Sequence, residues 1–524
     1  MKRILIIIMI AAAFLSGCKK MLNQVPKDTT YAEKFWKSEN DMKKALAGAY
    51  AALRSNMLEQ DYLHNLGDMT LGSQYIVITG SAPYFYNSDW NIQIGKFEMN
   101  YLDVFRNWSR FYSTILQTNL ILEKLPLVPD NTFQDDAEKG RKQIAGQALF
   151  IRSYVYFQLL RTFGDVPLVL KEDPEPIANK PLARTDKNLV VQQILNDLDA
   201  AANCLDMEYQ VETDRGTVPN KAAVMALQAQ VYMWRACVIK RPSFDATPDM
   251  GDVSKASALI EQIIGSGLYG LPMTNGMVDS IRYSKVFVGN SRESIFELYT
   301  RYAYNEGSNN LMPMKFLRVP VLAKTYASSL GLGTSYVNTL FPRIIQTGPN
   351  KGDTIPDTDI RRNLFMYDAD GTSPIFIKYN NIIYNNPNQL TEPYLDNNVS
   401  LIRYADLLLS RMEIAVYNGQ LGAAYSQLRD FRHSRNRPQM DSVAFVSEAP
   451  LSYNRLLDEI MTERACELFM EGQLYFDNVR MKRSFVPWLT PGRYNQEGYL
   501  MPLDPALFNN NRLLVQNKYW AGKI

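Results

Sequence analysis

Residues 144–167, IAGQALFIRSYVYFQLLRTFGDVP, hold the pattern that decides the fold. Apolar side chains recur every three or four residues, at Ile144, Ala148, Ile151 and Val155. This spacing places them on one face of a helix, which indicates that the face is buried. The helix should end near Gly164, because glycine suits the left-handed cap of a helix and Pro167 cannot continue one.

Comparable helical stripes lie on both sides of this stretch. They begin at Met42, Trp108, Val191, Ala222, Ala256, Ala405 and Leu457. Before the first stripe, Ser38 and Asp41 resemble a capping box with aspartate in the usual glutamate position. The stripe at Ala222 consists of small residues, which let helix axes come close, as in stacked hairpins. No clean fixed-period repeat is present, so we predict a mainly α fold with degenerate tetratricopeptide-type hairpins at best.

The helical periodicity fades between residues 271 and 400, where Gly, Pro, Asn and Tyr become frequent. The stretch YNNIIYNNP, residues 379–387, is typical. A segment of this length without regular structure is usually functional or disordered. Its aromatic and branched residues argue against disorder. We therefore predict an ordered, irregular, loop-rich subdomain packed on the helical scaffold.

The N-terminal segment indicates export. Lys2 and Arg3 precede a short apolar run, and LSGC at residues 15–18 resembles a bacterial lipobox. The run is too short to span a bilayer, which needs about 20 apolar residues. We predict that residues 1–17 are removed and that Cys18 carries the lipid; the alternative is an ordinary signal peptide with Cys18 there by chance.

The bulk composition argues against several classes of protein. A net charge of +2, from 56 basic and 54 acidic residues, gives no electrostatic reason to expect nucleic acid as a partner. Cys204, Cys237 and Cys466 are an odd, widely spaced set, which predicts small buried side chains rather than disulfides. His64 and His433 are too few for a histidine metal site, and we expect neither a metal nor a cofactor.

Aromatic residues in loops are the first functional clue, because the chain contains 31 Tyr, 23 Phe and 6 Trp. A pyranose presents an apolar face to flat rings and a rim of hydroxyls to amides and acids. Two loop clusters fit this chemistry, and the ligand-binding residues that we predict from them are Tyr84, Tyr86, Trp90, Asn91, Tyr302 and Tyr304. Trp90 is the best individual candidate. The alternative is that these rings pack the irregular segment onto the scaffold, as we expect for Trp108, which lies on a helical stripe.

An enzymatic alternative depends on Glu463, Glu467 and Glu471, which recur on one helix face. A glycosidase needs two carboxylates about 5 to 9.5 Å apart across a cleft, and residues four apart on a helix meet that distance crudely. The structural interpretation is a charged face satisfied by arginines such as Arg464 and Arg480, and we favour it. We expect no catalytic residue, and we expect polar packing roles for Arg403, Asp406 and Arg411.

Motifs along the whole chain carry a resemblance to a known family. They are ALAGAY at 45–50, RSYVYF at 152–157, FGDVPL at 163–168, VPNKAA at 218–223, RYADLLL at 403–409 and ERACEL at 463–468. In this order they resemble the SusD/RagB family of Bacteroidetes outer-membrane nutrient-binding lipoproteins. The departures are few: Leu474 stands where the family commonly has arginine, and the closing segment at 501–505 reads MPLDP in place of a Pro-Ile-Pro element.

The resemblance implies a fold and a function. Tetratricopeptide-like hairpins would form a right-handed superhelical scaffold, with the loop-rich subdomain packed on it. Members sit as a lid on a SusC-like TonB-dependent transporter, bind oligosaccharides or in some branches peptides, and perform no chemistry. Their glycan site draws on loops from the two regions that hold the aromatic clusters.

The predicted organisation follows from both arguments. Residues 1–17 are a lipoprotein signal peptide, 18–270 a helical scaffold, 271–400 the irregular subdomain, and 401–524 the C-terminal helices and a surface-wrapping tail. We expect a surface-exposed outer-membrane lipoprotein that captures oligosaccharides for a TonB-dependent transporter. The alternatives are a surface-anchored glycoside hydrolase, a peptide-binding member of the same family and a periplasmic helical scaffold.

Overall fold

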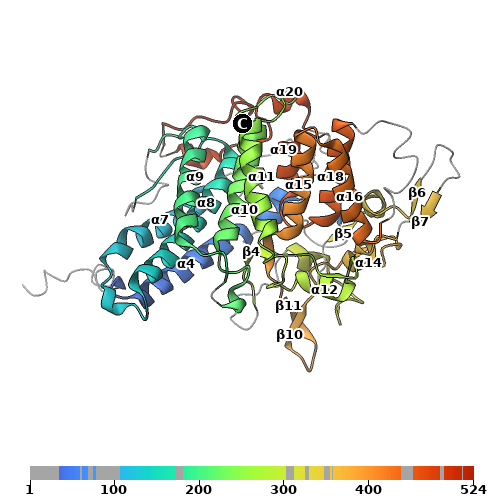
Figure 1. Cartoon of the computed structure of the whole chain (residues 1–524), viewed down its shortest axis with the longest axis horizontal. Helices are drawn as coiled ribbons and strands as arrows, with labels where there is room; N and C mark the ends of the chain where they lie inside the picture. The colour runs from blue at the N-terminus through green and yellow to red at the C-terminus, as the bar shows by residue number, and fades with distance from the viewer. Residues whose placement is uncertain are drawn as a thin grey trace, which may run out of the picture.

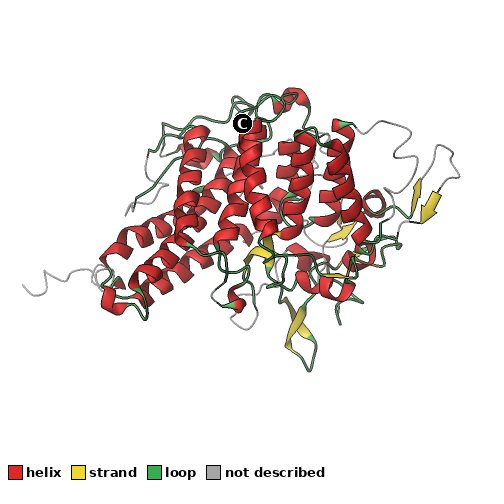
Figure 2. Ribbon diagram, viewed as in Figure 1, coloured by secondary structure: helices red, strands yellow, loops and turns green. Residues whose placement is uncertain are grey.

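The fold is mainly α-helical in a computed structural model of the chain (Figures 1 and 2). The structure describes residues 35–58, 62–68, 75–77, 107–171, 181–209, 211–301, 312–324, 330–346, 354–356, 358–437, 452–483, 489–509 and 511–523. The prediction of a mainly α fold is therefore confirmed, and long helices make up most of the described part of the chain (Figure 2).

The helices before the irregular region pack on their neighbours along the chain. They are α4 (Glu39–Leu58), α5 (Tyr62–Gly67), α7 (Ser109–Lys124), α8 (Ala137–Phe163), α9 (Lys187–Cys204), α10 (Lys221–Trp234) and α11 (Met250–Gly265). Helix α8 packs on α7 and α9, and α10 packs on α11, so the helices lie side by side in a row (Figure 1). This is the hairpin arrangement that the helical stripes predicted.

The local helix signals are found where the sequence placed them. Ser38 donates from Oγ to Asp41 Oδ2 (2.7 Å), and Asp41 N donates back to Ser38 Oγ (3.3 Å), which caps α4. Helix α8 ends at Phe163, where the end was predicted, and Gly164 follows it with a φ of 75° and a ψ of −114°, which favours glycine but is not the left-handed helical cap that we expected. Trp108 is a core residue, as predicted, and its ring packs edge-on against Phe163 at 5.5 Å.

Helix α10 continues into a π-helical turn, η7 (Arg235–Ile239), and is the most apolar helix of the described chain. Lys221–Ile239 is the one described helix long and apolar enough to cross a membrane, with a mean hydropathy of 1.2. Since 83% of that window is buried inside the protein, α10 is a core helix.

Short antiparallel strand pairs are scattered through the region between α11 and α15, and one of them includes β1 from earlier in the chain. They are β2 (Met273–Thr274) with β3 (Met277–Val278), β4 (Ser294–Leu298) with β12 (Val399–Arg403), β5 (Leu330–Leu332) with β1 (Tyr75–Val77), β6 (Ile344–Gln346) with β7 (Thr354–Pro356), β8 (Met366–Tyr367) with β9 (Ile375–Phe376), and β10 (Ile382–Asn386) with β11 (Thr391–Leu395). The short helices among them are α12 (Ser280–Val286), α13 (Thr334–Leu340) and α14 (Arg361–Phe365). The prediction of an irregular segment is compatible with these small pieces, while its boundaries at 271 and 400 stay predictions.

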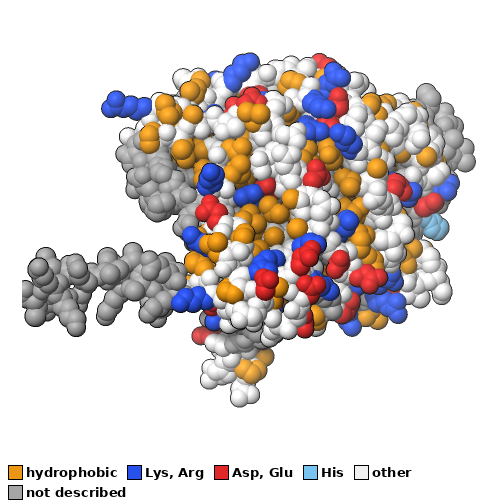
Figure 3. Space-filling model, turned by 60° about the vertical axis from the view of Figure 1, so that its left-hand side comes forward, with side chains coloured by type: hydrophobic (Ala, Val, Ile, Leu, Met, Phe, Trp, Pro, Cys, Tyr) orange, Lys and Arg blue, Asp and Glu red, His pale blue; other side chains and the backbone are white. Residues whose placement is uncertain are grey.

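The second group of helices follows β12. It contains α15 (Tyr404–Tyr417), α16 (Leu421–Ser434), α18 (Tyr453–Glu467), α19 (Leu474–Met481) and α20 (Pro491–Tyr494). Helix α15 packs on both α16 and α18, and it also contacts α11, which joins the two groups of helices (Figure 1). On the face shown in Figure 3, basic and acidic side chains are interspersed, in keeping with the small net charge.

Candidate functional site

The aromatic residues predicted to bind ligand lie outside the residues that the structure describes. These are Tyr84, Tyr86, Trp90, Asn91, Tyr302 and Tyr304, and the same holds for Cys18. Their roles stay predictions. The described residues on either side of the two clusters, however, show where the chain enters and leaves each cluster.

Strand β5 brings the flanks of the two clusters together. Val77, the last residue before the segment at 78–106, pairs with Leu330 in the antiparallel register of β1 and β5. The turn η9 (Met312–Phe316), which directly follows the segment at 302–311, also packs on β5. The described residues next to the two segments therefore contact the same short strand, although the segments lie far apart in the sequence. We call this arrangement of β1, η9 and β5 the β5 junction.

The residues just before Tyr302 have structural contacts. Arg301 donates from Nη1 to the carbonyl oxygen of Asp396 (2.9 Å) and from Nη2 to Asn290 Oδ1 (3.3 Å), so its guanidinium holds two loops together. The carbonyl oxygen of Tyr299 accepts from Arg54 Nη1 of α4 at 3.2 Å. The chain thus leaves β4 fixed against α4.

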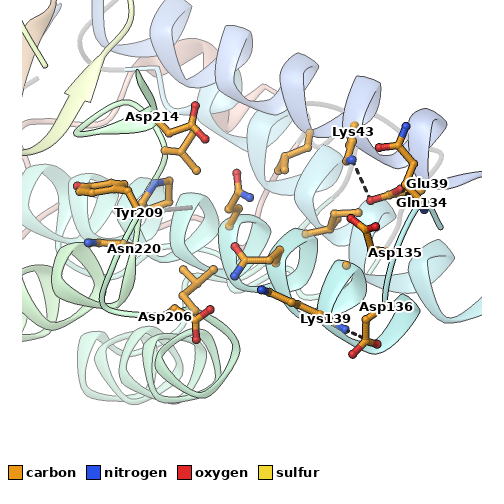
Figure 4. A pocket seen from close by; sticks show the side chains of 18 of the residues that line it. Glu39, Lys43, Gln134, Asp135, Asp136, Lys139, Asp206, Tyr209, Asp214 and Asn220 are labelled. Atoms are coloured by element: carbon orange, nitrogen blue, oxygen red, sulfur yellow. Dashed lines mark hydrogen bonds and ion pairs between the residues drawn. The ribbon is translucent and has the colours of Figure 1, made fainter. Parts of the chain in front are cut away.

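A groove lies along one face of α4. Its wider part, about 550 Å³, lies between α4, α8 and the connection from α9 to α10 (Figure 4). A second hollow of about 390 Å³ continues along α4 to the end of β4, and both are lined by Asp214 and Val218. We call the two together the α4 groove. Hollows of this size are typical of small-molecule sites.

Carboxylates dominate the polar lining of the wider part. Figure 4 shows Asp206 and Asp214 toward one end and Glu39, Asp135 and Asp136 toward the other. Burial opposes ionisation of Glu39, but bonds from Lys43 and from the backbone of Gln134 outweigh it and lower the pKa of that carboxyl. Burial raises the pKa of Asp214, which lies where the two hollows meet.

Tyrosines supply the flat surfaces of the groove. The Tyr209 hydroxyl lies 3.1 Å from the Tyr269 hydroxyl and accepts from Gly216 N (3.2 Å), so the ring is fixed from behind. Burial and the neighbouring Tyr269 raise the pKa of Tyr209 far above its usual range. In the second hollow, the Tyr50 hydroxyl donates to Gln147 Oε1 at 2.8 Å.

Glu463, Glu467 and Glu471 are structural, and they do not share one helix as predicted, because α18 ends at Glu467 and Glu471 lies in the turn before α19. Glu463 and Glu467 have no exposed surface, and Glu471 is 3% exposed, so none of them can face a substrate. Glu467 accepts from Arg361 (2.9 Å), Arg403 (2.9 Å) and Arg435 (3.2 Å). Despite burial, these arginines hold the pKa of Glu467 well below its ordinary value.

The partners of these glutamates differ from the predicted ones. We expected Arg464 and Arg480 to satisfy the glutamate face, but both pair with Asp477 instead. Arg464 also pairs with Asp406, and Arg480 also pairs with Glu413. The reason is that consecutive side chains on a helix point in different directions. Arg464 directly follows Glu463 on α18, and its side chain therefore faces a different neighbour, Asp406 of α15. The expected packing roles of Arg403 and Asp406 are confirmed, whereas Arg411 pairs with Glu261 at the surface.

No group of three or more His, Cys, Asp or Glu within the described ranges could hold a metal ion. The carboxylates of the α4 groove are therefore spread along it rather than gathered at one point. The three described cysteines form no disulfide. Cys237 and Cys466 are buried, as predicted, whereas the prediction was wrong for Cys204, which is only partly buried near the end of α9.

Comparisons with known proteins give the family. Residues 23–233 match a family described as starch-binding and associating with the outer membrane, and residues 367–488 match the SusD family. The chain belongs to the SusD/RagB family. Members of this family are binding proteins rather than enzymes, typically bind glycans, and are generally associated with the outer membrane.

Relatives of SusD match nearly the whole chain. SusD-like protein P38 of Formosa agariphila is 24% identical, over 98% of this chain and 97% of that protein. A SusD homologue of Bacteroides thetaiotaomicron, solved as a crystal structure, superposes with a TM-score of 0.73 and 24% identity, covering 93% of this chain and 99% of that one. Bacteroides fragilis NanU has the same fold, with a TM-score of 0.65 and 20% identity over 92% of this chain and 97% of its own. The SusD-like fold is tetratricopeptide-like, as predicted.

Sequence reasoning missed the α4 groove. Its lining comes from three separate segments, and the face of α4 that it uses carries Lys43, Ala47, Tyr50 and Arg54. The available signal was in the connection at 206–209, DMEY, where acids and a tyrosine follow the end of a helix outside any helical stripe.

Proposed function

We propose that this SusD-like protein is a cell-surface lipoprotein that captures oligosaccharides and delivers them to a SusC-like TonB-dependent outer-membrane transporter. The lipid would be attached at Cys18. The ligand would be held by Trp90, Tyr84, Tyr86 and Asn91 from one segment, and by Tyr302 and Tyr304 from the other.

The β5 junction is the observation that carries this proposal. A site assembled from two distant loops requires that one end of each loop be held near the other loop, and here the first loop leaves β1 while the second enters η9. Val77 lies on β1 and Met312 on η9, and both elements contact β5. A strand that anchors a binding loop favours binding, because the loop is then positioned when the protein folds and less free energy is lost in ordering it when the ligand binds.

Family membership supports a binding role rather than catalysis. The α18 glutamates, which were the best candidates for hydrolysis, are enclosed by arginines and cannot reach a sugar. The burial of these glutamates removes the main sequence argument for a glycoside hydrolase.

The test is titration calorimetry of the chain against a panel of neutral oligosaccharides. Trp90→Ala should weaken binding of the best ligand about tenfold or more, because one face of a sugar loses its flat partner. Tyr367→Ala is the matched control, since this tyrosine is exposed on β8 and removing it should leave affinity unchanged.

Thermal unfolding of both variants should match the unsubstituted chain. Unchanged affinity in Trp90→Ala would remove Trp90 from the site. Release of reducing sugar from any polysaccharide would favour the hydrolase, and binding of peptides alone would favour the peptide-binding branch.

A further inference from the structure

The α4 groove has a lining that the proposed glycan site does not use. None of its lining residues is among the six predicted aromatic-site residues. On α4, the lining side chains run from Glu39 to Arg54, four turns apart on one face. At 1.5 Å per residue this face is about 22 Å long, which suits an extended ligand rather than a single small ion.

The walls of the groove are already in place. Tyr209 is locked through Tyr269, whose hydroxyl donates to Asn220 Oδ1 (3.1 Å), and Asn220 in turn caps α10 through Ala223 N (3.0 Å). Arg215 lies over the Tyr209 ring at 5.2 Å and is held by Glu212. A fixed aromatic wall can bind a flat apolar face without an ordering cost.

The charge of the groove selects the ligand. Glu39 is neutralised by Lys43 at 2.9 Å, and Asp136 accepts from the first backbone amides of α8. Among the described contacts, four lining carboxylates have no hydrogen-bonding or ion-pair partner: Asp135, Asp206, Glu208 and Asp214. Of the cations that line the groove, Lys139 is the one whose side chain has no such partner among these contacts. An acidic ligand would therefore be repelled, and a cation attracted.

The spacing of these carboxylates does not favour a bound metal ion, because no group of three or more His, Cys, Asp or Glu among the described residues could hold one. A ligand that carries several separated positive charges matches them better. It must also present flat faces to Tyr209 and Tyr50 and hydroxyls to the amides of Gln143 and Gln147.

We propose that the α4 groove is a second binding site, for an oligosaccharide of amino sugars with free, protonated amines. Each sugar ring supplies one apolar face, several hydroxyls and one positive charge, and this combination matches the tyrosines, amides and unpaired carboxylates of the lining. A basic peptide would satisfy the carboxylates but leave the tyrosine walls without flat partners.

The experiment is calorimetric titration of the full chain in detergent with a glucosamine tetramer at about pH 6, where amines are protonated and most carboxyls ionised. An N-acetylglucosamine tetramer, a galacturonate tetramer and tetralysine are the comparison ligands. We expect the glucosamine tetramer to bind at least about tenfold more tightly than each of the other three. Raising the ionic strength from about 0.01 M to about 0.15 M should weaken that binding several-fold, because the Debye length falls from about 30 Å to about 8 Å.

Two carboxylate variants and one control locate the binding. Asp214→Asn and Asp135→Asn should each weaken binding of the glucosamine tetramer about fivefold or more. Glu138→Gln removes the same charge from exposed α8 surface, beside Lys142 and outside the groove, and should leave the affinity unchanged. Trp90→Ala should also leave it unchanged, which separates this site from the proposed glycan site.

Three results would overturn the proposal. One is that the glucosamine tetramer does not bind, or binds no better than its acetylated form. The second is that tetralysine binds as tightly with the same dependence on Asp214, which would make the groove a peptide site. The third is that Trp90→Ala abolishes binding while Asp214→Asn does not, which would assign the amino sugar to the aromatic loops.

Discussion

Glu467 accepts hydrogen bonds from Arg361, Arg403 and Arg435 in a part of the molecule that solvent does not reach. Arg361 comes from α14, Arg403 from the end of β12 and Arg435 from the end of α16. One carboxylate therefore ties three distant segments to α18. The cost of burying so many charges is offset only while every partner is present.

Glu467→Gln should destabilise the protein by about 3–5 kcal/mol, because the substitution leaves buried arginines without their counter-charge. Urea denaturation followed by circular dichroism measures the free energy of unfolding. Glu261→Gln is the control, since Glu261 pairs with Arg411 at the surface and should cost less than about 1 kcal/mol. Equal losses in the free energy of unfolding of the two variants would show that the buried ion pairs of Glu467 stabilise the protein no more than a surface ion pair does.

Glu463 predicts a specific acid sensitivity. Burial opposes its ionisation, but Arg361, Arg432 and Arg437 lower the pKa of this carboxyl from 4.5 to about 2. The contribution of Glu463 to the free energy of unfolding is complete above about pH 4.5 and disappears as the pH falls toward 2. The reason is that this carboxyl binds a proton at a higher pH in the unfolded chain than in the folded protein. The shift corresponds to about 3 kcal/mol.

The measurement compares the pH dependence of the free energy of unfolding between pH 5 and 2 in the unsubstituted chain and in Glu463→Gln. The variant should lose less stability over this range, by about the same 3 kcal/mol. Parallel curves would mean that Glu463 titrates normally in the folded protein.

At the scale of elements, helix α5 is pressed against the turn between α18 and α19. A Cβ on Gly67 would lie 2.1 Å from the carbonyl oxygen of Gly472, so two backbones touch here. Gly472 has a φ of 74° and donates from its N to Asp68 Oδ2 at 2.7 Å. The contact joins the end of α5 to the turn that follows α18.

Gly67→Ala should therefore destabilise the protein by about 2–3 kcal/mol, because the backbone of Gly472 would have to move. Thermal unfolding gives the comparison. Gly265→Ala, at the end of α11, meets nothing within 4 Å and should be neutral or gain up to about 1 kcal/mol. A neutral Gly67→Ala would contradict the close approach.

Elements whose signals are local could be predicted, and those that depend on distant partners could not. The cap of α4 at Ser38 and the end of α8 at Gly164 depend on residues within four positions, and both were found. Helix α16 was missed, because its buried face mixes Ala424, Leu428 and the charged Arg432, whose partner Glu463 is 31 positions away. The α4 groove was missed for the same reason, since no single segment contains its lining.

At the scale of the whole molecule, the lipid that we propose at Cys18 would decide where the binding surfaces work. Cys18→Ala should release the protein from the membrane fraction and end its labelling on intact cells, because one polypeptide without acyl chains has no durable membrane affinity. Cys204→Ala is the matched control, since Cys204 is a free, half-buried cysteine on α9. Membrane retention of Cys18→Ala would mean that another part of the chain anchors it.

The last described residues, 489–509 and 511–523, pack on the first half of the molecule. Met501 N donates to the carbonyl oxygen of Thr162 in α8 (2.8 Å), Asn511 Nδ2 to that of Leu182 (2.7 Å), and Trp520 is buried. If the chain is exported amino end first, as we propose, α8 lacks this contact with Met501 until the final residues have emerged. Premature termination near residue 488 would strip the cover from α8 and expose apolar surface, so truncated copies should be recognised as unfinished and degraded during export.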